Sequence, residues 1–159
     1  MLERSTTVLV LAAALGGCAI GVKHGYDETA LAPISSGAAN VAVGVHDERP
    51  YVVDGKKGDN FVGLSRGGFG NPFDINTRSG NPLATDMGKA ITNAFKQSGV
   101  KAEQVVLDKK LSQKQAQDRL LAAKADRSVL LELVGWKSDT YQHVALIYDL
   151  RLRVFDQGG

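Results

Sequence analysis

The sequence is poor in cysteine and histidine, the residues that most often build metal sites. Cys18 is the only cysteine among 159 residues, so an intramolecular disulfide framework and a thiolate zinc cluster are both excluded. The three histidines, His24, His46 and His143, lie far apart, and none has the neighbouring His or Cys of a metal motif. The sequence therefore predicts no metal and no cofactor.

Motifs of the common enzyme classes are also missing. No serine lies in a G-x-S-x-G elbow, and no G-K-[ST] phosphate loop occurs. Gly68-Phe69-Gly70 lacks the third glycine of a dinucleotide fingerprint. The segment from Asp74 to Arg78 begins like a calcium loop, but Arg78 stands at a ligand position and would repel the ion. We expect a protein that is not an enzyme.

Charge of either sign is not in large excess. Nineteen basic and seventeen acidic residues give a formal net charge of +2, and no basic stripe is visible. Because nucleic-acid binding depends on clustered positive charge, we expect no nucleic-acid partner.

The chain also lacks an apolar run long enough to span a bilayer. The run from Val8 to Leu15 is far shorter than the roughly 20 residues that a spanning helix needs. It follows a polar start with Arg4 and precedes small residues, which is the layout of a secretory signal. The segment is predicted to be an export signal.

The four residues Leu15-Gly16-Gly17-Cys18 at the end of this run resemble the bacterial lipobox. The resemblance implies a signal peptide over 1–17, cleavage between Gly17 and Cys18, and acylation of Cys18. More than one acyl chain would anchor the protein stably, at about 0.8 kcal/mol per buried methylene. The alternative is an ordinary signal or a buried amino-terminal helix in which Cys18 is incidental.

The residue after the cysteine bears on the membrane to which the lipid would attach. Ala19 is not the aspartate that, in the proteobacterial sorting rule, retains lipoproteins in the inner membrane. By this resemblance we expect a lipid anchor in the outer membrane, facing the periplasm.

Composition divides the rest of the chain into two parts. Residues 18–39 are rich in small residues and show no sustained apolar period, which predicts a flexible tether. Residues 40–159 have the length of one domain. They begin with alternating valines over 40–45, the period of a strand.

His46-Asp47-Glu48-Arg49 follows, and we expect a solvated turn there; the alternative is a site at the strand exit.

The stretch from Val53 to Gly80 is rich in glycine, which predicts a mobile surface loop with at most a ragged hairpin around 51–53 and 60–64. It carries Phe61, Phe69 and Phe73. Either these rings are tucked against the domain, or they are contacts for a partner.

Two helices are predicted from capping signals and apolar period. Asn81 is placed to cap the first, with Pro82 at the first helical position and an apolar face over 83–95, and Ser98-Gly99 closes it with glycine at the left-handed position. Ser112 and Gln115 form a capping-box pattern for the second, over 113–124.

Three further strands are predicted over 100–107, 128–136 and 143–155, the last two paired as an antiparallel hairpin through the polar residues 137–140. In the last strand an apolar face alternates with a largely polar one. We therefore expect an α+β fold, with a mixed sheet of about four strands and both helices packed on one face, in the order strand, glycine-rich loop, helix, strand, helix, strand, strand.

The combination of the lipobox, V-A-V-G-V followed by D-E-R-P, the glycine-rich stretch and P-L-A-T-D-M-G-K-A-I-T-N-A-F-K-Q-S-G-V resembles the YajG-like group of bacterial lipoproteins. More loosely, it is similar to the amino-terminal domain of the Tol translocation protein and related envelope lipoproteins. The resemblance implies a non-catalytic interaction or scaffold module in envelope assembly or maintenance, with a protein partner in the envelope. The alternative is a ligand- or lipid-binding auxiliary lipoprotein of a transport system.

The last residues, Asp156-Gln157-Gly158-Gly159, have the chemistry of a hairpin turn. A well-alternating strand before them should not remain a bare edge, because unpaired backbone groups attract other chains. We expect the chain to be truncated there; the alternatives are that 144–155 is a central strand, or that a partner adds a strand to its edge.

Overall fold

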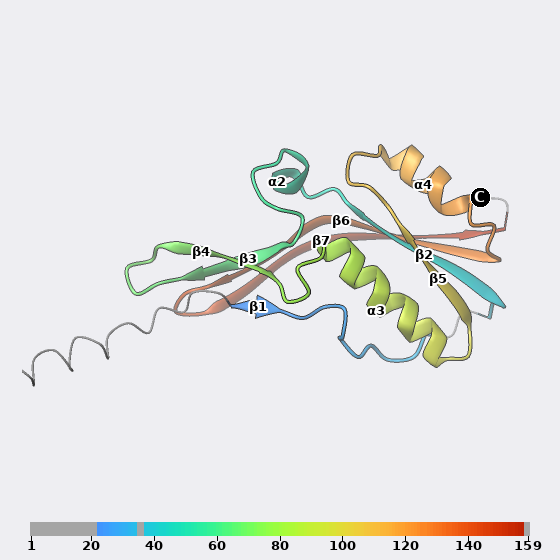
Figure 1. The fold of residues 1–159 in the computed structure, drawn as a ribbon, viewed down its shortest axis with the longest axis horizontal. Coiled ribbons are helices and arrows are strands. Elements are labelled where there is room, and N and C mark those ends of the chain that lie inside the picture. Colours follow the sequence, from blue (N-terminus) through green and yellow to red (C-terminus); the bar gives the residue numbers. More distant parts are fainter. Residues whose placement is uncertain (1–21, 35–36, 158–159) are drawn as a thin grey trace, which may run out of the picture.

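The computed structural model describes residues 22–34 and 37–157, which form a curled mixed sheet of seven strands with three helices (Figure 1). The strands are β1 (Lys23–His24), β2 (Asn40–Asp47), β3 (Phe61–Arg66), β4 (Pro72–Thr77), β5 (Lys101–Val106), β6 (Arg127–Thr140) and β7 (Val144–Asp156). The helices are α2 (Pro50–Val53), α3 (Leu83–Gln97) and α4 (Gln113–Leu121). None of the helices in these ranges is long and apolar enough to cross a bilayer.

The long strand β6 organises the sheet. Its first half pairs in parallel with β2, which in turn pairs in parallel with β5. Its second half pairs in parallel with β3, and the antiparallel hairpin of β3 and β4 extends the sheet to β1. Along its other side β6 pairs with β7 over the whole length of both strands. The prediction of about four strands is therefore wrong.

The two longer helices lie on opposite faces of this sheet, so the prediction that both pack on one face is also wrong (Figure 1). Phe95 of α3 packs on Val41 and Val43, whereas Leu120 of α4 packs on Ala42, whose side chain points to the other face. The chain moves from β2 to β5 in one direction across the sheet and then back past β2 to β6. Because parallel crossovers are right-handed, reversing the direction moves the second helix to the other face.

The glycine-rich stretch is more ordered than the sequence predicts. Residues 50–53 form α2 in place of half a hairpin, and β3 and β4 form a hairpin of six-residue strands whose buried residues are core. Phe61, Val62 and Ile75 contribute to that core. Gly63 allows β3 to approach β6, because a Cβ at this position would overlap Ser138.

An ion pair joins the same two strands further along. Arg66 on β3 donates two hydrogen bonds of 2.8 Å to the carboxylate of Asp139 on β6. These bonds lower the pKa of Asp139 and raise that of Arg66. The contact therefore holds at neutral pH and weakens only as the pH falls through the lowered pKa.

Local signals placed both long helices correctly, with shifts at their ends. The capping box of α4 is confirmed, since Gln115 N–H donates to Ser112 Oγ and Ser112 N–H donates to Gln115. Gly99 follows α3 with φ of 79°, the predicted left-handed residue. Pro82 is the N-cap of α3 and not its first helical residue, and Asn81 makes no capping bond.

Residues 22–34, within the predicted tether, run along the domain. β1 pairs with β4, and Ile34 N–H donates to Ala94 O of α3 at 3.2 Å. Asp27 forms an ion pair of 3.1 Å with Lys89, and Tyr26 packs edge-on against Trp136 with ring centroids 6.0 Å apart. This part of the segment therefore packs against the core of the domain through Tyr26 and Ile34.

β6 and β7 form the predicted antiparallel hairpin, but residues 137–140 belong to β6 and the turn lies at 141–143. Within the described ranges β7 pairs with β6 alone. The alternative that this strand is central in the sheet is therefore wrong.

Candidate functional site

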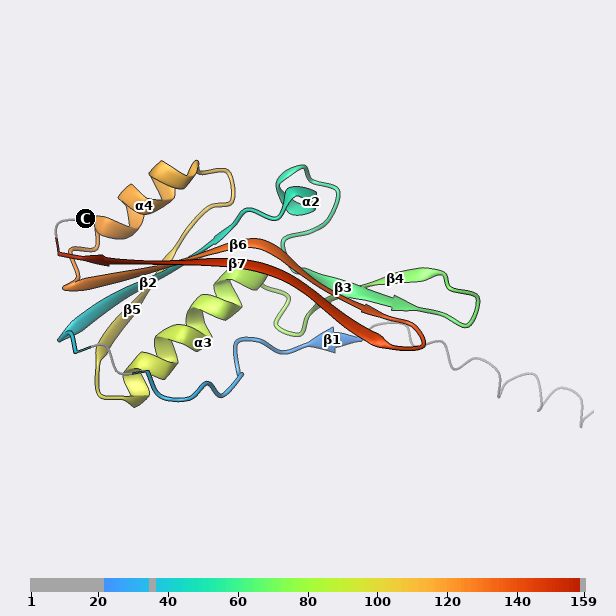
Figure 2. The ribbon, with the colours of Figure 1, turned by 180° about the vertical axis from the view of Figure 1, so that it is seen from behind.

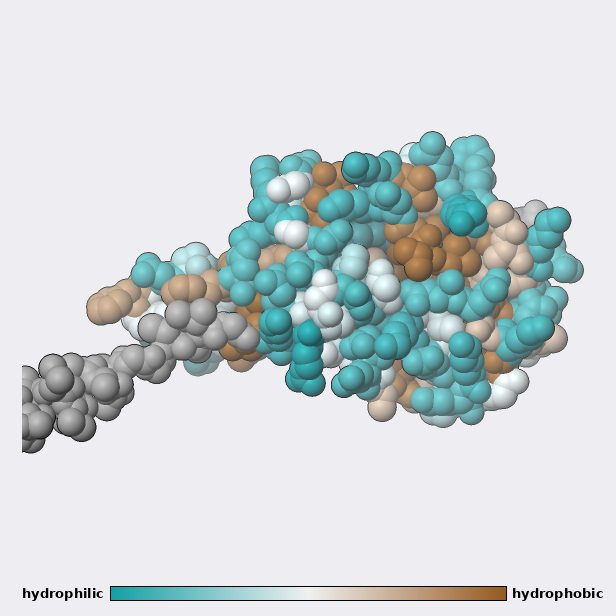
Figure 3. Space-filling model, viewed as in Figure 1, coloured by the Kyte–Doolittle hydropathy of each residue, from teal (hydrophilic) through white to brown (hydrophobic). Residues whose placement is uncertain are grey.

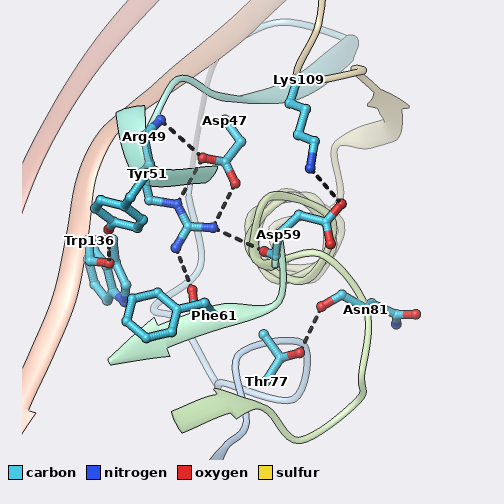
Figure 4. Close-up of polar contacts among 9 residues, drawn as sticks. All are labelled: Asp47, Arg49, Tyr51, Asp59, Phe61, Thr77, Asn81, Lys109 and Trp136. Atoms are coloured by element: carbon cyan, nitrogen blue, oxygen red, sulfur yellow. Dashed lines mark hydrogen bonds and ion pairs between the residues drawn. The ribbon is translucent and has the colours of Figure 1, made fainter. Parts of the chain in front are cut away.

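The exit of β2 is a buried polar network and not the solvated turn that the sequence predicts (Figure 4). Arg49 is fully buried and donates two side-chain hydrogen bonds to the carboxylate of Asp47, from Nε at 2.8 Å and from Nη2 at 2.7 Å. The same guanidinium donates to the backbone carbonyls of Phe61 and Asp59. One charged side chain thus ties the end of β2 to the start of β3.

Neighbouring contacts extend this network to other elements (Figure 4). The Tyr51 hydroxyl donates to Trp136 O on β6 at 2.7 Å, and Thr77 Oγ1 donates to Asn81 O at 2.7 Å. The guanidinium nitrogens of Arg49 and the hydroxyls of Tyr51 and Thr77 all donate to groups of the protein itself. We therefore assign Asp47 and Arg49 to the stability of the fold and not to ligand binding.

A second polar pair lies where β2 and β6 run side by side. His46 and Glu132 are register partners, and both are buried. His46 Nδ1 lies 3.0 Å from Glu48 Oε1, and Arg153 Nε on β7 lies 3.1 Å from Glu132 Oε1 without hydrogen-bond geometry. Ligands of open α/β sheets bind at such a position, where the strand order reverses.

A shallow cavity of about 370 Å³ opens beside His46. Glu48, Lys109 and Gln113 line it, but its wall has no serine, threonine or cysteine to act as a nucleophile. Residues 22–34 and 37–157 contain no group of three or more His, Cys, Asp or Glu residues that would hold a metal ion. This cavity offers a charged rim.

The feature that distinguishes the surface is β7. Seven of the fourteen exposed large apolar side chains in the described part of the chain lie on this strand: Val144, Leu146, Ile147, Tyr148, Leu150, Leu152 and Val154. The six at even positions share one face and are 36–73% exposed. Figure 2 shows β7 in front of the other elements, with no segment over it, whereas hydrophilic residues cover most of the opposite side in Figure 3.

An apolar groove of about 400 Å³ continues this face toward α3. Its lining is Gly25, Tyr26, Thr29, Leu31, Met87, Ala90, Ile91, Leu131, Trp136 and Leu150. Trp136 Nε1 donates to the Tyr26 hydroxyl at 3.2 Å, and burial raises the pKa of Tyr26. The groove thus joins the amino-terminal segment, α3 and the hairpin of β6 and β7.

The aromatic residues predicted as partner contacts do not form one surface. Phe61 is only 2% exposed and packs edge-on against Tyr51, so it belongs to the core. Phe69 is 98% exposed at the turn between β3 and β4, and Phe73 is partly exposed. Cys18 and Gly17 lie outside the described residues.

The alternation of residues 144–155 was visible in the sequence, but its apolar face was expected to meet the core. What the sequence does not reveal is that α3 packs on β2 and β5, so that most of β7 is exposed in the described part of the chain. The fold and this strand define a mixed-sheet domain with a long open apolar edge. Comparisons with protein family models, curated proteins and solved structures find no match to this chain.

Proposed function

We propose that this chain is a membrane-anchored bacterial lipoprotein whose domain is a non-catalytic interaction module of the cell envelope. The observation that carries the proposal is β7, a strand of 13 residues hydrogen-bonded on one side only within the described structure. Such an edge offers a row of free N–H and C=O groups to an extended segment of another chain.

The side chains of β7 favour the same function. Natural edges are protected by charged side chains, proline, short length or a bulge. β7 is 13 residues long and contains no lysine or proline, and its charged residues all lie at or after Asp149. Every second side chain of β7 is apolar and would contact the partner strand, and hydrogen bonds between the two backbones would supply the rest of the affinity. A long edge with an exposed apolar face of this kind is suited to pairing with another strand.

Photo-crosslinking in living cells tests this proposal. A crosslinking amino acid in place of Leu152 on β7 should capture a polypeptide chain, because 65% of this side chain is exposed at the open edge. The same amino acid in place of Lys114 on α4, whose side chain is 83% exposed, is the control and should capture little. Equal capture at both positions, or none at either, would contradict the proposal.

Attachment to the membrane is tested separately at Cys18. The intact mass of protein extracted from membranes should correspond to a chain that starts at Cys18 and carries acyl groups. Cys18→Ala should release the chain from the membrane or leave the signal uncut. A soluble mature form without lipid would show that this part of the proposal is wrong.

The groove beside β7 favours a second candidate, a lipid- or ligand-binding auxiliary. Trp136, the only tryptophan of the chain, lines the groove and reports on its occupancy. If lipid binds there, titration with oleate should shift and saturate the tryptophan emission, and Ile91→Arg in the groove wall should weaken the response about tenfold or more. An unchanged emission spectrum would rule out oleate-like ligands.

A further inference from the structure

We infer that the chain that pairs with β7 is a second copy of this protein, whose β7 runs antiparallel in the register that puts Leu150 opposite the partner's Leu150. This inference rests on the proposed function, because it names the occupant of the same edge. A two-fold axis through such a pair makes the interface self-complementary, so each contact occurs twice.

Length selects this register first. β7 spans residues 144 to 156, so Leu150 is its central residue. With Leu150 on the axis, Val144 lies opposite the partner's Asp156, and every residue of the strand has a cross-strand neighbour. Any other register leaves residues at one end of each strand unpaired.

Charge selects the same register independently. Asp149 and Arg151 flank the central leucine and project from the same face of β7. In the centred register, Asp149 lies opposite the partner's Arg151, and Arg151 opposite the partner's Asp149. A shift by two residues brings two Asp149 carboxylates or two Arg151 guanidiniums together, and like charges directly opposite one another are unfavourable.

The remaining charges of β7 are already used within one chain. Arg153 pairs with Glu132, and Asp156 accepts a hydrogen bond from Arg127 at 3.0 Å. In the described structure neither Asp149 nor Arg151 forms an ion pair. Arg151 lies opposite Glu132 in the register of β6 and β7, but the ion pair of Glu132 is made by Arg153. The two charges of β7 that form no ion pair in the described structure are therefore the two that the symmetric pairing matches.

The apolar face is matched in the same register. Tyr148 lies opposite the partner's Leu152, and Leu146 lies opposite the partner's Val154. An aromatic or aliphatic side chain next to an apolar neighbour across the strands stabilises a sheet. The apolar faces of the two β7 strands thus become one continuous surface, and each face covers the edge of the other.

Charge exchange tests the register. The full chain, acylated and in detergent, is compared with its variants by sedimentation equilibrium. Asp149→Arg and Arg151→Asp should each raise the dimer dissociation constant about tenfold or more, because each opposes like charges twice. The double exchange should restore dimerisation, and an equimolar mixture of the two single variants should form heterodimers. Dimers unaffected by either exchange, or no rescue, would overturn the register.

Disulfide trapping gives a readout that does not depend on charge. In a Cys18→Ser background, Leu150→Cys should form a covalent dimer on oxidation, because the two Cα atoms on the axis are within disulfide range. Tyr148→Cys is the matched control on the same face and should not, since the partner's residue 148 lies several residues away along the strand. Equal trapping at both positions would overturn the centred register.

The outcomes also separate this inference from the proposed function. A monomeric protein whose residue 152 crosslinks to a different polypeptide overturns the second copy and leaves the interaction module standing. If the protein is a monomer and another segment of the same chain protects the β7 amides from hydrogen exchange, both the pairing of two copies and the proposed interaction module are overturned.

Discussion

Replacing Arg49 by methionine is expected to lower the free energy of unfolding by about 3–5 kcal/mol, because it leaves the Asp47 carboxylate buried without a counter-charge. Arg49 and Asp47 are 0% and 3% exposed, so water does not reach either group to compensate. The carbonyls of Phe61 and Asp59 also lose their donor. Urea unfolding followed by circular dichroism measures the loss.

Two controls show that the loss comes from the buried charge. Lys114→Ala removes an exposed ion pair with Asp118 and should cost no more than about 0.5 kcal/mol. The double variant Asp47→Leu with Arg49→Met should be more stable than Arg49→Met alone, because no buried charge remains. A loss below about 1 kcal/mol in the single variant would mean that Arg49 is not the anchor of this network.

Replacing Phe95 by alanine is expected to cost about 3–5 kcal/mol, because the ring of α3 fills the core between Val41, Val43 and Val129. Phe69→Ala is the matched control, since that ring is 98% exposed and its loss should change stability by no more than about 0.5 kcal/mol. Thermal or urea unfolding of the two variants gives the comparison.

Phe61→Ala extends the same experiment to the glycine-rich stretch. The ring is buried against Tyr51, so its loss should also cost about 3–5 kcal/mol. If Phe61→Ala were as harmless as Phe69→Ala, the hairpin of β3 and β4 would not belong to the core. Phe61 would then again be a candidate for partner contact.

Short-range signals determined the helices. Ser112 and Gln115 satisfy each other's backbone donors across one helical turn, and Gly99 ends α3 because it adopts a left-handed conformation without a steric cost. Each of these effects involves residues a few positions apart, so one sequence is sufficient to read them. The alternation of β7 is local in the same way.

Contacts between distant residues determined what the sequence did not show. The glycines of 53–80 argue for a loop, yet Phe61, Val62 and Ile75 are buried because β3 pairs with the far half of β6. Burial of apolar side chains outweighed the weak local preference for strand. The sequence also predicts His46 and Arg49 in solvent. His46 is buried because β2 pairs with β6, where Glu132 is its register partner, and Arg49 is buried because β3 brings the carbonyl of Phe61 to it.

The sequence by itself determined the two long helices, the strands β2, β5, β6 and β7, and the single cysteine after an apolar run. Only the tertiary structure decided that the helices lie on opposite faces and that β7 is an open edge. Strand order is set by which pairings together bury the most apolar surface, and that choice involves the whole chain at once. Because α3 covers β2 and β5, the apolar face of β7 is exposed within the described residues.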